Sequence, residues 1–140
     1  MNGRFFLDTN IFVYSFDAGS PAKARRAAEL IRRAVATGKG IVSFQVAQEF
    51  FNVALRRFAQ PMTVAEAENY LTTVFRPLMA IHSSQALYTE ALRLSERYSL
   101  PWYDALIVAA ALEGNSALLL SEDFQHGQRF GGLHVQNPFL

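Results

Sequence analysis

The sequence predicts an α/β protein in which helices cover a mostly parallel sheet. Short apolar runs alternate along the chain with longer segments whose apolar residues recur at helical spacing. Capping and turn residues separate most of these segments. The 140 residues are 51% hydrophobic and 18% charged, which is typical of a compact globular chain, so we expect one domain over residues 1–140.

The chain opens with a strand and two helices. Residues 4–7 form a short apolar run, and residues 10–16 favour a helix. Ser20 and Pro21 have the pattern of an N-cap followed by proline at the first helical position, which predicts a helix to about residue 37. The buried face of this second helix is expected to hold its regularly spaced apolar residues: Ala24, Ala27, Ala28, Ile31, Ala34 and Val35.

Capping and stop signals delimit the remaining elements. Ser43 can cap one helix, Thr63 and Glu66 have the spacing of a capping box, and Gly114 with Asn115 is a helix stop signal. In chain order we expect a strand at 41–42, helices at about 44–58 and 63–76, a strand at 78–81, helices at 85–98 and 102–113, and strands at 117–120 and 133–136. Strands that alternate with helices pair in parallel, because each connection crosses one face of the sheet.

Composition excludes several classes of protein and of site. The chain has no cysteine, which excludes disulfides, thiolate zinc sites and cysteine nucleophiles. The longest stretch without a charged residue, Pro77 to Thr89, is shorter than the roughly 18 residues of a membrane-spanning helix. The first residues do not resemble a secretory signal, so a cytoplasmic protein with no membrane partner is expected. Phosphate-binding glycine loops and the serine-hydrolase elbow are absent.

Four acidic residues stand at the edges of apolar segments: Asp8, Glu49, Asp104 and Asp123. Asp8 and Asp123 follow expected strands and the helix with Glu49 begins directly after one, so these three can share the carboxyl edge of the sheet. Helix capping or solvation would account for Asp8, Glu49 or Asp123 alone, whereas the position of Asp104 at the start of an otherwise uncharged helix favours a function. If the fold gathers all four, a divalent cation is the natural compensation for their desolvation and repulsion. Oxygen ligands suit Mg²⁺ or Mn²⁺, whereas zinc usually adds histidine or thiolate.

The segments that carry the four acids resemble, in order, the motifs of PIN domains, and most closely those of the toxins in bacterial VapBC toxin–antitoxin systems. The matching segments are Leu7 to Tyr14, the helix around Glu49, Tyr103 to Ile107, and Ser121 to Asp123. The resemblance implies a three-layer α/β/α fold and an Mg²⁺- or Mn²⁺-dependent endoribonuclease. It also implies an RNA substrate, a cognate antitoxin and a homodimer. The implied catalytic and metal-binding residues are Asp8, Glu49, Asp104 and Asp123, with Thr9, Asn10 and Ser121 hydrogen-bonding around them.

Within this hypothesis Asp8 and Asp104 are the most direct metal ligands, because strand ends and helix starts are rigid. Glu49 and Asp123 would bind a second metal or orient the attacking water. Residues 1–60 carry nine Lys or Arg against four Asp or Glu, an excess compatible with a polyanionic partner or with ordinary solvated helix faces. The residues considered for RNA phosphate contacts are Arg25, Arg26, Arg32, Arg33, Arg56 and Arg57.

Two other functions stay open on the sequence. Asp8 could be the nucleophile of a phosphotransferase, although such enzymes usually carry a second acid two residues later, where this chain has Asn10. The fold could also serve as a non-catalytic RNA- or protein-binding module. The sequence does not specify the RNA target, the antitoxin, or the identity and number of metals.

Overall fold

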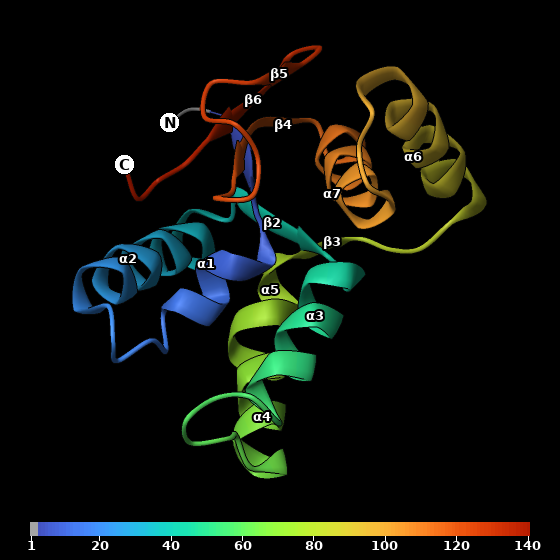
Figure 1. Ribbon diagram of the computed structural model, residues 1–140. Helices are drawn as coiled ribbons and strands as arrows, with labels where there is room; N and C mark the ends of the chain where they lie inside the picture. The colour runs from blue at the N-terminus through green and yellow to red at the C-terminus, as the bar shows by residue number, and fades with distance from the viewer. Residues whose placement is uncertain (1–2) are drawn as a thin grey trace.

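A six-stranded sheet runs through the computed structural model, which describes residues 3–140 and so leaves only residues 1 and 2 of the predicted domain outside it (Figure 1). The strands are β1 Arg4–Leu7, β2 Gly40–Ser43, β3 Met79–Ile81, β4 Ser116–Leu120, β5 Arg129–Phe130 and β6 Leu133–Gln136. Their order across the sheet is β3-β2-β1-β4-β6-β5. Every neighbouring pair is parallel except β5 with β6. The predicted mostly parallel sheet is therefore confirmed, and the short β5 is an addition to it.

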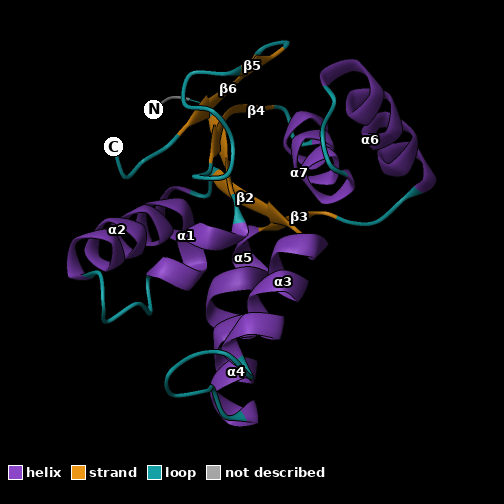
Figure 2. Ribbon diagram, viewed as in Figure 1, coloured by secondary structure: helices purple, strands orange, loops and turns teal. Residues whose placement is uncertain are grey.

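Helices flank this sheet on both sides (Figure 2). They are α1 Thr9–Tyr14, α2 Pro21–Thr37, α3 Phe44–Ala54, α4 Val64–Tyr70, the π-helical segment η1 Leu71–Phe75, α5 Arg76–Leu78, α6 Gln85–Tyr98 and α7 Trp102–Glu113. In Figure 1, α1 and α2 lie to the left of the sheet, α6 and α7 lie together on the right, and α3 and α4 extend below it. This arrangement agrees with the expected α/β class. Among residues 3–140, no helix combines the length and the hydrophobicity needed to cross a bilayer.

The centre of the sheet explains why the first apolar run lacks polar alternation. Phe5, Phe6 and Leu7 of β1 are all buried, because β1 lies between β2 and β4 and helices cover both of its faces. Helix α7 is apolar all round for a similar reason, since residues 105–111 are buried between α6, the sheet and the rest of the core. Both elements place their acidic end residues on a rigid, buried scaffold.

Helix α2 buries a slightly different face from the predicted one. Ala27, Ile31 and Ala34 are buried as expected, but Val35 is 38% exposed and Leu30 is buried in its place. At about 100° per residue, Leu30 lies about 60° from Ala27 on one side, and Val35 lies about 80° from Ala27 on the other side, so the buried face is turned towards Leu30. Ala24 and Ala28 lie on the same side as Val35 and are half-buried.

Helix α3 ends earlier than predicted, and the predicted helix over residues 63–76 changes its type part-way. Helix α3 stops at Ala54, because the carbonyl of Ala54 accepts the amide of Met62 at 2.9 Å and the chain folds back there. The predicted capping box of α4 is present, with reciprocal bonds of 2.9 and 3.1 Å between Thr63 and Glu66. The helix then widens into η1 before Pro77, whose missing N–H and bulky ring are incompatible with a regular α-turn.

Substituting Gly40 with alanine is expected to destabilise the fold. A Cβ at Gly40 would overlap the Cβ of Ala34 on α2 and lie 2.7 Å from its Cα, which is backbone that cannot rotate away. Overpacking of this kind costs about 1–3 kcal/mol, so the free energy of unfolding in urea should fall by at least that amount. Gly132→Ala is the control, because a Cβ there meets nothing within 4 Å. Equal stability of the two variants would contradict the close helix–strand contact.

Candidate active site at the carboxyl edge of the sheet

The sheet reverses its strand order between β1 and β4, and the candidate site lies at that point. From β1 the chain continues to β2 and β3 on one side, whereas β4 and β6 lie on the other. In open parallel sheets the crevice beyond the strand ends at such a reversal is the usual ligand site. Asp8 directly follows β1 and Ser121 directly follows β4, and the amide of Asp8 donates to the carbonyl of Leu120 at 3.0 Å.

Asp8 is the most buried of the four acids, at 4% exposure. One carboxylate oxygen accepts the amide of Thr9 at 2.7 Å, as the N-cap of α1, and the other accepts the hydroxyl of Ser121 at 2.7 Å. Burial raises the pKa of Asp8 to about 7, and the charges of Asp123 and Glu49 add to this effect. The hydrogen bonds from Ser121 and Thr9 oppose the rise without cancelling it. The two hydrogen bonds to Asp8 therefore do not make up for the loss of hydration that its ionised carboxylate suffers on burial.

Glu49 is held by two side chains from the scaffold. The Thr9 hydroxyl donates to one carboxylate oxygen at 2.6 Å, and the Gln45 amide donates to the other at 3.3 Å. The same Gln45 nitrogen also donates to the carbonyl of Tyr103 at 3.2 Å. Glu49 is half-buried and Gln45 is buried. The spacing of four residues between Gln45 and Glu49 was the available signal for this contact.

Asp104 and Asp123 complete the acidic group from the other side. Asp104 lies in the first turn of α7 and is half-buried, so burial raises its pKa, and the charges of Asp123 and Glu49 raise it further. Asp123 is exposed in the loop after β4, where its amide donates to the Ser121 hydroxyl oxygen at 3.0 Å. Asp8 and Asp104 thus each lie within electrostatic reach of Glu49 and Asp123, which links the four acids.

The group has the donor chemistry of a hard-cation site, although it is open. Across residues 3–140, no three His, Asp or Glu side chains are grouped closely enough to form a ready metal site. The donors are carboxylate oxygens, and burial, together with the charges of neighbouring carboxylates, raises the pKa values of Asp8 and Asp104. A divalent cation with oxygen ligands would supply the missing compensation, so the residues fit such an ion.

The three predicted supporting residues behave differently. Thr9 bonds to Glu49, and Ser121 joins Asp8 to the backbone of Asp123. Asn10 differs from the expectation, since both polar atoms of its side chain are buried and have no hydrogen-bond partner within residues 3–140.

The predicted arginines do not form one group beside the acids. Helix α2 starts near the carboxyl edge, where Lys23 pairs with Glu122 at 3.1 Å, and runs back to β2 at the opposite edge. Arg33 is therefore about 15 Å further along the axis than Lys23. Arg26 and Arg33 each lie 3.9 Å from Glu29, and Arg25 and Arg32 are exposed. Arg56 and Arg57 lie in the turn after α3, beyond the end of the helix that carries Glu49.

A salt bridge that the sequence did not predict fixes the loop bearing Asp123. The ammonium of Lys23 contacts both carboxylate oxygens of Glu122, at 3.1 and 3.2 Å. The same ammonium lies 4.4 Å from the ring centre of Tyr14 and 5.5 Å from that of Phe139. Residue 122 is thereby tied to α1, α2 and the C-terminal segment.

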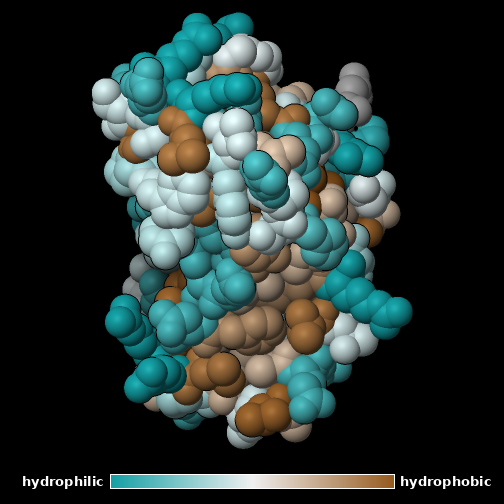
Figure 3. Space-filling model, turned by 90° about the vertical axis from the view of Figure 1, so that its right-hand side faces the viewer, coloured by the Kyte–Doolittle hydropathy of each residue, from teal (hydrophilic) through white to brown (hydrophobic). Residues whose placement is uncertain are grey.

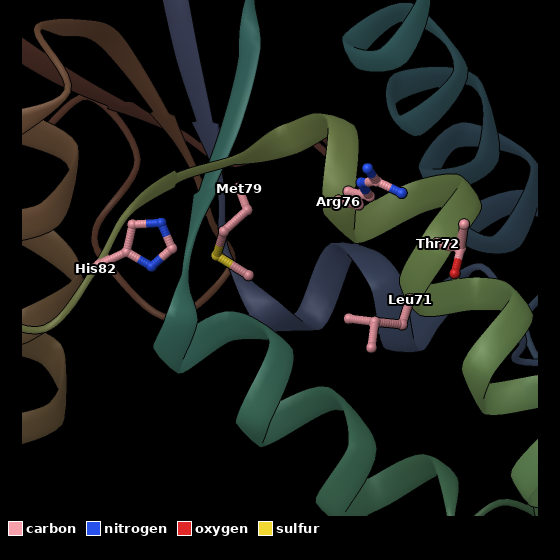
Figure 4. A pocket seen from close by; sticks show the side chains of 5 residues that line it. All are labelled: Leu71, Thr72, Arg76, Met79 and His82. Atoms are coloured by element: carbon pink, nitrogen blue, oxygen red, sulfur yellow. The ribbon is translucent and has the colours of Figure 1, made fainter.

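A pocket of about 480 Å³ lies away from the acids, and its lining includes none of them. Figure 4 shows its five labelled side chains, which come from η1, α5, β3 and the segment after β3. Its only ionisable side chains are Arg76 and His82, so it does not offer the carboxylate chemistry of the carboxyl edge.

Comparison with known families agrees with this geometry. The family model of the PIN domain matches residues 5–129, which include all four acids. The chain belongs to the PIN domain family. The recognition drawn from the four motifs is thereby confirmed. No match was found among curated protein sequences.

Solved structures share the fold of this PIN domain at low sequence identity. A toxin–antitoxin complex from Klebsiella pneumoniae matches with a TM-score of 0.70 and 21% identity, over 95% of this chain and 96% of that one. VapBC2 from Rickettsia felis, bound to a DNA fragment from its promoter, matches with a TM-score of 0.66 and 16% sequence identity. The match covers 94% of this chain and 96% of that one. The sarcin–ricin loop cleaving toxin VapC20 of Mycobacterium tuberculosis matches with a TM-score of 0.61 and 21% sequence identity. The match covers 85% of this chain and 91% of that one.

Proposed function

We propose that this PIN domain is a metal-dependent endoribonuclease and the toxin of a type II toxin–antitoxin pair. The observation that carries the proposal is the convergence of Asp8, Glu49, Asp104 and Asp123 at the strand-order reversal of a PIN fold. The structural relatives support the biological setting, since they are toxin–antitoxin proteins and one of them cleaves RNA. The four acids are the proposed catalytic and metal-binding residues.

Mg²⁺ or Mn²⁺ would be held by these carboxylates, with Asp8 and Asp104 as the ligands on the most rigid positions. When bound, such an ion supplies charge neutralisation at the scissile phosphate and a lower pKa for a coordinated water. The protein itself supplies orientation. Thr9 and Gln45 fix the two oxygens of Glu49, and Ser121 fixes Asp8 relative to the loop of Asp123. The carboxylates of Glu49 and Asp8 are thus oriented before the substrate arrives.

An antitoxin and a second copy of the chain are the proposed protein partners. The antitoxin is supported by the relatives, which are described as complexes with one. Figure 3 shows a brown, hydrophobic area on the lower half of the right-hand face, where α3 and α4 extend below the sheet. Leu55 and Leu71 are both more than 40% exposed in this part of the chain. Exposed apolar surface of this kind is typical of protein interfaces, so it supports the proposed homodimer.

Removal of metal is expected to abolish RNA cleavage. The purified protein should cut an unstructured RNA in Mg²⁺ or Mn²⁺, lose that activity in EDTA, and regain it when the ion is added in excess. The physical reason is that the four carboxylates repel an incoming phosphate unless a cation is bound. The measurement is gel analysis of the RNA ends, and sequencing of RNA ends after induced expression would identify the target.

Two outcomes would favour the other functions. RNA that binds but stays intact at every metal concentration would indicate a non-catalytic binding module. A burst of phosphate from a small phosphomonoester would indicate an aspartate-nucleophile phosphotransferase. The asparagine two residues after Asp8 argues against the second, because its amide can neither donate nor accept a catalytic proton as a carboxyl group does.

A further inference from the structure

Two large aromatic side chains are exposed at the start of α7. Tyr103 is 65% exposed and Trp102 is 38% exposed, although most aromatic residues of this chain pack in the core. A third ring, Tyr88 in the first turn of α6, is 40% exposed and lies 6.1 Å from Trp102 between ring centres. Exposed rings of this size are costly to leave in water and commonly mark a contact surface.

This aromatic pair is physically joined to the acidic group. Tyr103 directly precedes Asp104, and the Tyr103 carbonyl accepts the Gln45 amide at 3.2 Å. The same amide nitrogen donates to Glu49 at 3.3 Å. The rest of α7 is buried from residue 105 to residue 111, so the first turn is anchored to a rigid helix. The exposed ring of Tyr103 therefore belongs to the residue directly next to Asp104 in the first turn of α7.

We propose that Tyr103 and Trp102 form a platform on which unpaired bases of the substrate stack while the neighbouring phosphate lies at the acids. This inference rests on the proposed function and assigns to Tyr103 and Trp102 the positioning of bases in its substrate. Aromatic faces bind every base with little sequence preference, but only bases that are free of a duplex can reach them. The arginines described above are dispersed, so base stacking supplies binding energy that a basic groove would otherwise provide.

The chain contains one tryptophan, which makes Trp102 a direct reporter of this contact. The probe is an unstructured RNA of 12 adenosines, compared with an abasic oligonucleotide of the same backbone length. Titration into the Asp8→Asn protein in Mg²⁺ should quench Trp102 emission with the adenosine RNA and leave it unchanged with the abasic one. The two probes carry the same phosphate charge, so a difference between them reports the bases alone.

Matched variants in the Asp8→Asn background separate stacking from other effects. Tyr103→Ala is expected to weaken binding of the adenosine RNA about tenfold, since it removes the ring on which a base would stack. It should leave binding of the abasic probe unchanged. Tyr103→Phe keeps the ring and should bind as the parent does. Leu92→Ala, which removes a 60%-exposed apolar side chain from α6, is the control and should have no effect.

Three results would overturn the inference. The first is equal binding of both probes with no effect of Tyr103→Ala, which means that the backbone alone is bound. The second is saturable RNA binding, followed by anisotropy, without any change in Trp102 emission. The third is Trp102 emission that depends on protein concentration without RNA, which makes this face a contact between copies. Metal-dependent cleavage by the wild-type protein is scored separately, so the proposed function can stand when the platform fails.

Discussion

Asp8→Asn and Asp104→Asn should each lower RNA cleavage at least about a hundredfold while the protein stays folded. Electrostatic groups at a reacting centre are typically worth about 10²–10³ in rate, and both substitutions remove a proposed metal ligand of full negative charge. Asparagine has nearly the same shape as aspartate. At position 8 its oxygen can still accept the Thr9 amide, and its NH₂ can donate to the Ser121 hydroxyl.

The control for this experiment is Glu113→Gln, an acid-to-amide change at the exposed far end of the helix that begins beside Asp104. This substitution changes the net charge by the same amount as Asp8→Asn or Asp104→Asn, and the variant protein should cleave RNA as the wild type does. Circular dichroism and thermal unfolding establish that each variant is folded. Undiminished cleavage by folded Asp8→Asn and Asp104→Asn proteins would rule out the acidic quartet as the catalytic centre.

The metal-free protein is expected to lose stability as pH rises from about 4 to about 7. The pKa of Asp8 is about 7 in the folded protein and 3.8 as its ordinary value, so between these values the folded state holds a proton that the unfolded state has released. Unfolding then becomes easier as pH increases. At roughly 1.4 kcal/mol per pKa unit, the loss approaches about 4 kcal/mol, and the raised pKa of Asp104 acts in the same direction.

Urea unfolding in EDTA at several pH values measures this loss. Asp8→Asn cannot ionise at this position, so it should be more stable than the wild type near pH 8 and show a much flatter pH dependence. Addition of Mg²⁺ at pH 8 should restore stability to the wild type, because the ion binds only the folded site. The lowered pKa of Glu66 has the opposite sign and acts below its ordinary value of 4.5, so it overlaps only the acidic end of this range. An equally steep decline in Asp8→Asn would contradict the assignment.

The sequence predicted the positions of the four acids in the fold better than it predicted the contacts that orient their side chains. Asp8 and Asp123 could be placed because a strand end fixes the position of the next residue, and Asp104 because a helix start does. Burial of Gln45 could not be read from its own helix, since it depends on the Tyr103 carbonyl of α7, 58 residues away in the chain. The contact between Lys23 and Glu122 joins residues that are 99 positions apart, so it also could not be predicted from the local sequence.

Errors in the fold also came from interactions outside the local pattern. The early end of α3 depends on an amide from Met62, and the widened turn of η1 depends on Pro77 in a segment that otherwise favours regular helix. The sequence also did not give the direction of α2, which carries Arg33 towards the amino edge of the sheet. Periodicity fixes which face of a helix is buried, but not how far along the sheet each residue lies.

The bond between Ser121 and Asp8 joins residues that are 113 positions apart. Strand β1 leaves the ribosome first, yet it lies in the middle of the sheet and needs β4, which is made about 110 residues later, to cover its second edge. During synthesis the chain therefore contains Asp8 long before it contains the partner that orients it. A nascent or prematurely terminated chain lacking β4 cannot assemble the acidic group. For a protein proposed to destroy cellular RNA, this topology delays activity until translation has passed residue 123.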